Sequence, residues 1–333
     1  MSPFQLTRTL PVDATDAALR ADVLHGLTLP QGLDSARPGG TPIPKTLPPK
    51  WFYDARGSAL FDEITTLPEY YPTRAEREIL QTRAPEIAGA TGARTLIELG
   101  SGSSEKTRHL IDALPGLHTY VPVDVSESAL TGAANTLIAS RPSLNVHALI
   151  SDFTRGLALP GTPGPRLVAF LGGTIGNLLP AERSAFLASV RSLLSPGDAL
   201  LLGTDLVKEE SVLVSAYDDG AGVTASFNKN VLTVINRELG ADFDPDAFSH
   251  VAVWDREHEW IEMRLRSLAA QTVKIPALDL AVDFERHEEM RTEISAKFRE
   301  DGVRAELSAA DLKLTHWWTD ERARFALSLS VAR

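Results

Sequence analysis

The 333-residue chain contains no cysteine. This excludes disulfides, thiolate nucleophiles and every metal site built on cysteine. Its eight histidines include no pair with the HExxH spacing of a zinc enzyme, and pairs such as His250 and His258 show no other ligand pattern. We therefore expect a protein that binds no metal.

Long hydrophobic runs are also missing. No uninterrupted apolar stretch approaches the about 18–20 residues that a membrane-spanning helix needs. The amino-terminal sequence MSPFQLTRTLPVDATDAAL lacks the basic start and apolar stretch of a secretion signal. These absences favour a cytoplasmic protein with no membrane partner, and we expect it to be a monomer.

Positive charge is scarce, because 33 Lys and Arg stand against 44 Asp and Glu, for a net charge of −11. Such a chain is a poor partner for nucleic acid, but it suits a cationic or zwitterionic small ligand. The apolar fraction of 43% is that of an ordinary globular protein. The length suggests two lobes.

The order of hydrophobic patterns predicts the fold class. Helical periodicity covers 16–26, a Pro- and Gly-rich loop covers 37–49, and two helical stretches follow, broken by Pro68 and Pro72. Strands then alternate with helices. We predict strands at 95–99, 119–124, 145–152, 166–173 and 198–205, and helices at 103–113, 127–140 and 181–194. This alternation is typical of an α/β protein with a doubly wound parallel sheet.

The alternation stops after Asp205. Residues 206–240 have a helical pattern, 250–275 form antiparallel strands around a charged turn, and 315–333 form a closing hairpin. An antiparallel hairpin on a parallel sheet is more typical of a methyltransferase core than of a symmetric dinucleotide-binding fold.

The stretch TLIELGSGSSEKTRHL, from Thr95 to Leu110, contains a glycine turn that three ligands could use. A triphosphate loop needs glycine where Glu105 stands, and a carboxylate there would repel phosphate. The dinucleotide pattern GxGxxG fails at the same residue. Asp124, 22 residues after Gly102, could accept hydrogen bonds from a ribose in an NAD enzyme or in a methyltransferase.

S-adenosylmethionine matches this region better than either alternative. Glu98 lies next to the turn and suits a site that attracts cationic groups, while Gly100 and Gly102 let the backbone approach a cofactor closely. Asp124 and Asp152 end the next two predicted strands, where the ribose and the adenine edge would lie. Acidic residues at three successive strand ends are more specific than one glycine turn.

Several longer motifs identify a family. They are LPPKWFYDARGSALFDEITTLPEYYPTRAE, IELGSGSSEKT, FLGGTIGN, LLGTDLVK, AYDD, GVTASFNKN, TEISAKF and THWWTD. Together they resemble the histidine-specific N-α-methyltransferases of bacterial ergothioneine biosynthesis, from about residue 16 to the carboxyl terminus. The resemblance implies that S-adenosylmethionine donates three methyl groups to the α-amine of L-histidine, which gives hercynine (histidine betaine).

The resemblance also implies an architecture and a set of site residues. We expect a Rossmann-like class I methyltransferase domain (74–206 plus 297–333) and a smaller α+β substrate domain (16–73 plus 207–296), with histidine between them. The cofactor contacts implied are Gly100, Lys106, Asp124, Asp152 and Phe153. The substrate contacts implied are Tyr70, Gly172, Thr174, Asn177, Tyr217, Met263, Glu293, Ile294 and Ser295, and Tyr53 and Asn177 are placed at the reacting amine.

These residue types suit the chemistry of histidine. Asn177 and Tyr217 would donate hydrogen bonds to its carboxylate. Glu293 and Ser295, two apart on a predicted strand, would face the same side and hold the imidazole. Tyr53, with Phe61 beside it, could form an aromatic wall that accepts a methylated cation.

Two other functions stay open at this point. One is an N-methyltransferase for another aromatic amino acid, such as tryptophan or tyrosine, although Glu293 would match an indole or a phenol poorly. The other is a non-catalytic module that only binds S-adenosylmethionine, although the many polar residues expected around a substrate speak against it.

Overall fold

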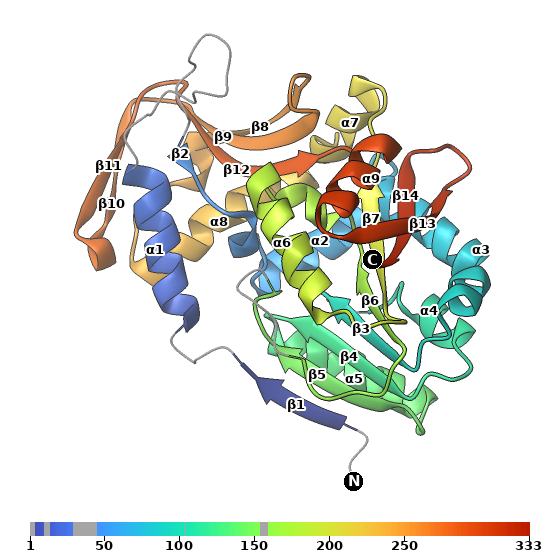
Figure 1. Ribbon diagram of the computed structural model, residues 1–333. Helices are drawn as coiled ribbons and strands as arrows, with labels where there is room; N and C mark the ends of the chain where they lie inside the picture. The colour runs from blue at the N-terminus through green and yellow to red at the C-terminus, as the bar shows by residue number, and fades with distance from the viewer. Residues whose placement is uncertain (1–3, 10–13, 29–44, 103, 154–158) are drawn as a thin grey trace. The chain divides into compact units, whose positions relative to one another are not determined.

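A computed structural model describes residues 4–9, 14–28, 45–102, 104–153 and 159–333 (Figure 1). The chain divides into two compact units, and several segments distant in sequence share each unit. Unit 1 comprises Met1–Pro11, Pro72–Val207 and Lys297–Arg333, and unit 2 comprises Val12–Tyr71 and Lys208–Ala296. Among the described residues, every helix is too short or too polar to span a bilayer.

Unit 1 is built on an eight-stranded sheet with the order β1-β5-β4-β3-β6-β7-β14-β13. Its strands are β1 (Phe4–Arg8), β3 (Thr95–Leu99), β4 (Thr119–Asp124), β5 (Asn145–Ile150), β6 (Arg166–Phe170), β7 (Ala199–Asp205), β13 (Leu312–Thr319) and β14 (Phe325–Ala332). The first six strands in this order are parallel, and β14 and β13 are antiparallel. The predicted α/β class and the closing hairpin are thus confirmed.

Helices cover both faces of this sheet, so every residue of β3 and β7 is buried. The helices are α3 (Pro72–Thr91), α4 (Arg108–Ala113), α5 (Glu127–Ser140), α6 (Pro180–Leu193) and α9 (Glu300–Ala309). Leu80 and Ile87 of α3 join Leu96 and Leu201 in one apolar core. On the other face Phe186 of α6 packs against Phe170, with ring centroids 4.6 Å apart. Central strands buried on both faces explain the nearly continuous apolar runs in the sequence.

The strand order reverses between β3 and β6, since β4 and β5 follow on one side and β7 on the other. In a doubly wound sheet, ligands bind at the carboxyl ends of the strands beside such a reversal. The loop after β3 begins at Gly100, and the loop after β6 contains Gly172. The topology therefore brings the glycine turn and the LGGTIGN loop to the same edge of the sheet.

The start of one helix and an edge strand are among the features of unit 1 that differ from the sequence prediction. The helix expected at 103–113 begins only at Arg108. Ser104 has a left-handed backbone with φ +54° and cannot belong to a right-handed helix. Ser103 itself lies outside the described residues. The edge strand β1 was not predicted; four of its five residues are exposed, so it lacks the apolar alternation of a half-buried strand.

Unit 2 combines helices with a four-stranded sheet of order β2-β12-β9-β8 and a separate hairpin β10-β11. Its strands are β2 (Lys45–Thr46), β8 (Phe248–Asp255), β9 (Trp260–Ser267), β10 (Gln271–Ile275), β11 (Leu280–Phe284) and β12 (Glu289–Ala296). Its helices are α1 (Ala14–Thr28), α2 (Ala55–Thr66), α7 (Glu210–Tyr217) and α8 (Val223–Leu239), with the short 3-10 helix η1 (Pro49–Phe52). The antiparallel pairing of β8 and β9 confirms the strands predicted around a charged turn.

One apolar core holds unit 2 together. Phe227 and Val231 of α8 pack there with Ile261, Met263 and Leu265 of β9. The predicted helical region 206–240 forms two helices: the first ends at Tyr217, where Asp218 leaves the helical backbone conformation, and Asp219 caps the start of the second. Its carboxylate accepts hydrogen bonds from the amides of Val223 and Thr224 at 3.0 and 2.7 Å. Of the loop predicted at 37–49, residues 37–44 lie outside the described residues.

Candidate functional site

The glycine turn of unit 1 folds back onto the strand beside it. The amides of Gly100 and Ser101 donate to the Val123 carbonyl at 2.8 and 3.1 Å. Gly100 has φ +69°, and a Cβ there would lie 3.4 Å from the ring of Phe153. Glycine thus satisfies the left-handed backbone and allows the turn to lie against that ring. Phe153 is held in turn by an edge contact with Phe170, centroids 5.3 Å apart.

Asp124 closes the glycine turn from the end of β4. One of its oxygens accepts from the amide of Gly102 and the other from the amide of Ser126, both at 2.9 Å. Each carboxylate oxygen has a second lone pair, so Asp124 retains acceptor capacity for ligand hydroxyls. Asp152 lies half-buried two residues after the end of β5, so the polar strand ends expected from the sequence share one edge of the sheet.

Glu98 has a different place from the one expected. We expected its carboxylate to attract a cationic ligand, but the residue is only 4% exposed, and its two oxygens accept hydrogen bonds from the hydroxyls of Thr107 and Tyr120. Tyr120 also contacts the Ser104 hydroxyl at 2.8 Å. Glu98 therefore ties the segment after the glycine turn to β3 and β4 from within the core.

Lys106 connects the two loops at the strand reversal. Its ammonium forms an ion pair with Glu76, a fully buried residue of α3. The other oxygen of Glu76 accepts a hydrogen bond from the Gly172 amide at 2.7 Å. A Cβ on Gly203 would lie 2.5 Å from this oxygen, so the glycine in β7 leaves the space that Glu76 occupies.

The LGGTIGN loop follows β6 with two left-handed residues, Gly172 (φ +80°) and Gly173 (φ +71°). The 3-10 helix η3 (Thr174–Asn177) comes next and ends at Asn177. A Cβ on Gly172 would lie 3.8 Å from the Lys106 ammonium nitrogen. Gly172 and Lys106 are therefore neighbours, and Thr174 and Asn177 follow within one short turn.

These features of unit 1 suit S-adenosylmethionine. Gly100 offers a close backbone approach beside the Phe153 ring, Asp124 has acceptor capacity for ribose hydroxyls, and Lys106 offers a cation for a carboxylate. The neighbouring Glu105 is exposed and lies 3.6 Å from Arg77, so the third glycine of a phosphate loop is replaced by a solvated side chain.

In unit 2, aromatic rings gather around Tyr53. Its ring makes edge contacts with Phe61 and Phe227, with centroids 5.6 and 5.4 Å apart, and 44% of Tyr53 is exposed. The local fold depends on Gly57, because a Cβ there would lie 1.7 Å from the Phe52 carbonyl oxygen. Only glycine therefore lets α2 pack against η1.

The adjacent Asp54 fixes the start of α2. It accepts hydrogen bonds from the Gly57 amide and the Asn230 side chain, both at 2.8 Å, and from Arg237 at 2.7 Å. Burial raises the pKa of Asp54, but these hydrogen bonds outweigh it, and the pKa is lowered below its ordinary value. The segment that carries Tyr53 and Phe61 is thus firmly anchored.

A chain of contacts continues from these rings to β12. Phe61 contacts Tyr70 and Tyr70 contacts Tyr217, with centroids 6.1 and 6.4 Å apart. The hydroxyls of Tyr217 and Ser295 share a hydrogen bond of 2.7 Å. The fold thereby assembles predicted site residues that lie more than 200 positions apart in sequence.

Glu293 and Ser295 do lie on a strand and share one face of it. Glu293 pairs with Met263, and Ser295 pairs with Ile261; both partners belong to the apolar core of unit 2. Directly paired residues of antiparallel strands project from the same face, so Met263 and Glu293 are neighbours. Ile294 pairs with Glu262 and points to the opposite face, so only its backbone can lie beside these residues.

One residue that sequence reasoning missed is Glu76. It occupies a core position of α3, where Ala75, Ile79 and Leu80 are also buried. A glutamate within an apolar helical stripe is the signal that could have indicated it.

Groups of three or more His, Cys, Asp or Glu able to hold a metal do not occur in the described part of the chain.

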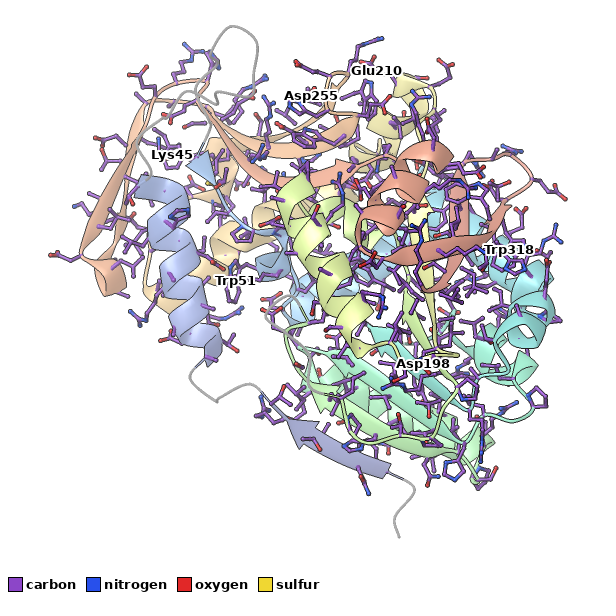
Figure 2. The ribbon with its side chains drawn as sticks, viewed as in Figure 1. Lys45, Trp51, Asp198, Glu210, Asp255 and Trp318 are labelled. Carbon is purple, nitrogen blue, oxygen red and sulfur yellow. The ribbon has the colours of Figure 1, made fainter. Side chains whose placement is uncertain are left out.

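A cavity of about 440 Å³ lies elsewhere in unit 1. It is lined by residues of 159–166 and 195–198, including Arg166 and Asp198, of which Asp198 is labelled in Figure 2. Arg166 is the first residue of β6 and the other lining residues precede β6 or β7, so the cavity lies at the amino ends of the strands. The residues of the glycine turn lie at the carboxyl ends, and the cavity is not part of the candidate site.

Comparison with known proteins agrees with this geometry. The family described as "Histidine-specific methyltransferase, SAM-dependent" matches residues 19–332. The chain is 54% identical to the histidine N-alpha-methyltransferase of Mycolicibacterium smegmatis, covering 98% of this chain and 99% of that protein. It is 53% identical to the protein of the same name from Mycobacterium tuberculosis, covering 96% of each.

A more distant relative is ergothioneine biosynthesis protein 1 of Schizosaccharomyces pombe. It is 32% identical over 63% of this chain and 29% of its own length. The match to the family covers nearly the whole sequence, including both units. The chain belongs to the family of histidine-specific, S-adenosylmethionine-dependent methyltransferases.

Proposed function

We propose that this protein transfers three methyl groups from S-adenosylmethionine to the α-amine of L-histidine and so produces hercynine, in the first step of ergothioneine biosynthesis. Family membership and the names of the mycobacterial and fungal relatives support this function. The structural observation that carries it is the pairing of Glu293 with Met263 on the face where Ser295 contacts Tyr217. This arrangement suits a small polar ring.

We assign the cofactor to unit 1. When bound, S-adenosylmethionine supplies an electrophilic methyl group on a sulfonium. Asp124 accepts hydrogen bonds from its ribose, Asp152 lies toward the adenine, and Gly100 and Phe153 border it closely. Lys106 provides a positive charge for its carboxylate, and Glu76 holds the Lys106 ammonium near Gly172. We propose a cofactor-binding role for unit 1 and a substrate-binding role for unit 2.

We assign the histidine contacts to residues of both units. Asn177 and Tyr217 donate hydrogen bonds to the carboxylate of the amino acid, and Tyr70 adds a hydroxyl. Glu293 accepts the N–H of the imidazole, and Ser295 donates or accepts beside it. A hydrogen bond to a charged group contributes about 1.5–3 kcal/mol. The remaining predicted contacts are Gly172, Thr174, Met263 and the backbone of Ile294.

Methyl transfer needs positioning more than acid–base chemistry. The amine must be neutral, and its lone pair must point at the methyl carbon. Fixing two reactants in this orientation can supply about 7–11 kcal/mol of the barrier reduction. We place Tyr53 and Asn177 near the amine, where aromatic rings favour the growing methylammonium by about 0.5–2 kcal/mol. An aromatic wall tolerates each added methyl group, which suits three successive transfers.

A single experiment tests the proposal. Purified protein is incubated with S-adenosylmethionine labelled in its methyl group and with each of the twenty amino acids in turn. We expect label to enter histidine alone, up to three methyl groups for each molecule. Labelling of tryptophan or tyrosine instead would favour another aromatic substrate, and cofactor binding without any transfer would favour the binding module.

Because the assigned contacts belong to both units, histidine added with S-adenosylhomocysteine should slow amide hydrogen exchange in both. Protection confined to one unit would contradict the assignment.

A monomeric state and a cytoplasmic location are further parts of the proposal. Size-exclusion chromatography with light scattering tests the first, and cell fractionation tests the second.

A further inference from the structure

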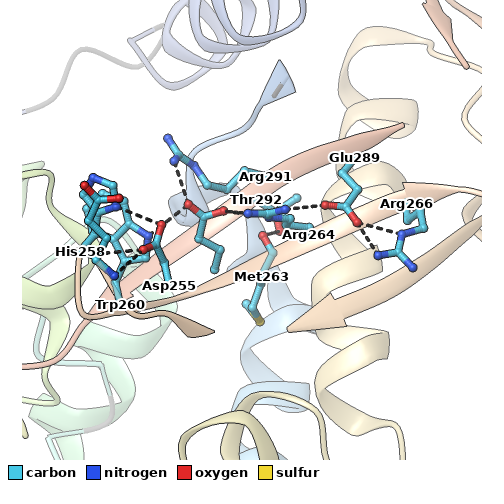
Figure 3. A network of polar contacts seen from close by, with 11 residues as sticks. Asp255, His258, Trp260, Met263, Arg264, Arg266, Glu289, Arg291 and Thr292 are labelled. Carbon is cyan, nitrogen blue, oxygen red and sulfur yellow. Dashed lines mark hydrogen bonds and ion pairs between the residues drawn. The ribbon is translucent and has the colours of Figure 1, made fainter. Parts of the chain in front are cut away.

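The two faces of the unit 2 sheet have different chemistry. Figure 3 shows a line of ion pairs on one face, where Arg264 contacts Glu289 at 2.5 Å and Arg291 contacts Glu262 at 3.2 Å. The other face carries the apolar core, to which Met263 belongs. A side chain of β12 therefore lies among arginines if it points to one face, and beside the proposed substrate-binding residues if it points to the other.

A bulge in β12 changes which face of the sheet its side chains point to. Arg291 pairs with Arg264 and Glu293 pairs with Met263, so the register shifts and Thr292 is an extra residue without a partner position in β9. One extra residue moves every later side chain to the opposite face of the sheet. In a regular strand, Glu293 would lie opposite Glu262, and Thr292 would take the position beside Met263.

Thr292 is fixed where it sits. The residue is fully buried. Its hydroxyl lies 2.6 Å from the side-chain oxygen of Asn228 and 3.0 Å from the carbonyl oxygen of Met263. A buried hydroxyl without such acceptors would be costly, so the extra residue is favoured at this position over its neighbours in the strand.

Asn228 links Thr292, through His250, to Tyr217, which is one of the proposed substrate contacts. It is fully buried in α8, and its amide nitrogen donates to the Arg264 carbonyl at 3.1 Å and to Nδ1 of His250 at 2.8 Å. Nε2 of His250 then donates to the backbone carbonyl of Tyr217 at 2.7 Å. These contacts require the neutral Nε2–H form, and burial lowers the pKa of His250 accordingly.

We propose that Thr292 and Asn228 are positioning residues for substrate recognition, which direct Glu293 and Ser295 onto the face of Met263 and hold Tyr217 beside them. This inference rests on the proposed function, since it assumes that Glu293 contacts the imidazole. Neither residue touches the substrate. Both act through the geometry of the bulge and of the buried polar contacts behind it.

Paired substitutions at Thr292 test the proposal. Thr292→Val keeps the shape and removes the hydroxyl, whereas Thr292→Ser keeps the hydroxyl. We expect Thr292→Val to lower kcat/KM for histidine about tenfold, mainly through KM, and Thr292→Ser to stay within about twofold of the wild type. The Kd of S-adenosylhomocysteine should not change, because unit 1 holds its proposed contacts.

The matched control is Thr95→Val. Thr95 is also fully buried, and its hydroxyl donates to the Pro163 carbonyl at 2.7 Å in unit 1. This variant tests the general effect of losing a buried hydroxyl, and we expect its histidine KM to be that of the wild type. An equal rise in KM for Thr95→Val would attribute the effect to lost stability and overturn the proposal.

A double-mutant cycle with Glu293→Gln shows whether Thr292 acts through Glu293. In the Glu293→Gln background, Thr292→Val should change kcat/KM for histidine by less than about twofold. An undiminished tenfold loss in that background would overturn the inference, as would a Thr292→Val variant with normal kcat/KM. If Glu293→Gln alone left histidine turnover unchanged, the assigned role of Glu293 in the proposed function would fail instead.

Discussion

The hydroxyl of Tyr120 on β4 donates a hydrogen bond to the carboxylate of Glu98 on β3, directly behind the glycine turn. Burial raises the pKa of Glu98 to about 7, although the hydroxyls of Thr107 and Tyr120 and the nearby Lys106 act to lower it. The residue is enclosed in the protein, so its ionisation is linked to folding rather than to direct contact with a ligand.

We therefore predict that Glu98 makes stability fall as the pH rises. Its pKa is about 7 in the folded protein against a reference of 4.5, so the folded state binds more protons between these values. The contribution is fully present below pH 4.5 and is lost as the pH rises through about 7. At 1.36 kcal/mol for each pH unit, the loss is about 3 kcal/mol.

Glu98→Gln should remove this dependence, because the amide does not titrate. Urea unfolding of both proteins, at about pH 5 and about pH 8, measures it. The free energy of unfolding of the wild type should fall relative to that of Glu98→Gln over this interval. Parallel pH profiles for the two proteins would mean that Glu98 titrates near its ordinary value when folded.

A second prediction concerns the ion pair of Lys106 and Glu76. Lys106→Met leaves a fully buried carboxylate without its cation, which should cost about 3 kcal/mol of stability. The substitution should also weaken the binding of S-adenosylhomocysteine. Adding Glu76→Gln removes the buried charge and leaves an oxygen to accept from the Gly172 amide. The double variant should therefore regain stability in thermal unfolding without regaining affinity in calorimetry.

A distant buried ion pair provides the control for this experiment. Asp198 lies at the amino ends of the strands and pairs with Arg166 at 2.5 Å. Asp198→Asn should lower stability while leaving the Kd of S-adenosylhomocysteine unchanged. If the Lys106→Met/Glu76→Gln variant bound this ligand as the wild type does, Lys106 would serve the fold alone.

A third prediction distinguishes the candidate cofactors. Asp124→Ala should weaken S-adenosylhomocysteine at least about tenfold in calorimetry, because it removes an acceptor for the ribose. The carboxylate also holds the Gly102 amide, so part of this loss reflects the turn. Wild-type protein should show no comparable binding of ATP or NAD, and tight binding of either would refute the cofactor assignment.

Metal independence is the fourth prediction. The chain has no cysteine, and the mechanism proposed for methyl transfer needs no Lewis acid. Activity on histidine should persist after extensive treatment with a chelator. A loss of activity that a divalent ion restores would contradict this.

The central sheet was predictable because its strands are buried on both faces. Each reads as a short apolar run between turn residues, and β4 and α5 have the predicted boundaries. The edge strand β1 was not predictable, because its exposed residues depend on pairing with β5, in which each partner lies 142 positions away. Local patterns do not record such a partner.

The residues of the candidate site also differ in how far the sequence predicts their positions. Strand-end residues such as Asp124 can be located from the topology alone. The side-chain direction of Glu293 cannot, because an alternating pattern does not show a bulge at Thr292, and the hydroxyl of Thr292 contacts Asn228 in a distant helix. Glu98 was misjudged for a related reason, since its hydroxyl donors come from outside its own strand.

The last prediction concerns specificity and rests on the pairing of Glu293 with Met263. Among the proposed contacts, Glu293 alone is a carboxylate directed at the side chain of the substrate. Asn177 and Tyr217 are assigned to the carboxylate that every amino acid carries, so their removal should weaken the binding of all amino-acid substrates alike. Removing Glu293 should weaken the binding of histidine selectively, because the imidazole presents an N–H to the Glu293 carboxylate. The loss of about 1.5–3 kcal/mol corresponds to roughly 10- to 150-fold in affinity.

Met263 sets the space beside this carboxylate. It is only 2% exposed, and its flexible side chain fills the apolar core next to Glu293. Glu293→Ala with Met263→Val should therefore both neutralise and enlarge the site. We expect the double variant to favour tryptophan over histidine in competition assays with labelled cofactor, while Met263→Val alone should keep its preference for histidine because the carboxylate remains. A double variant that retained the full preference for histidine would show that Glu293 does not bind the imidazole, and the substrate site would then have to be sought on other residues of unit 2.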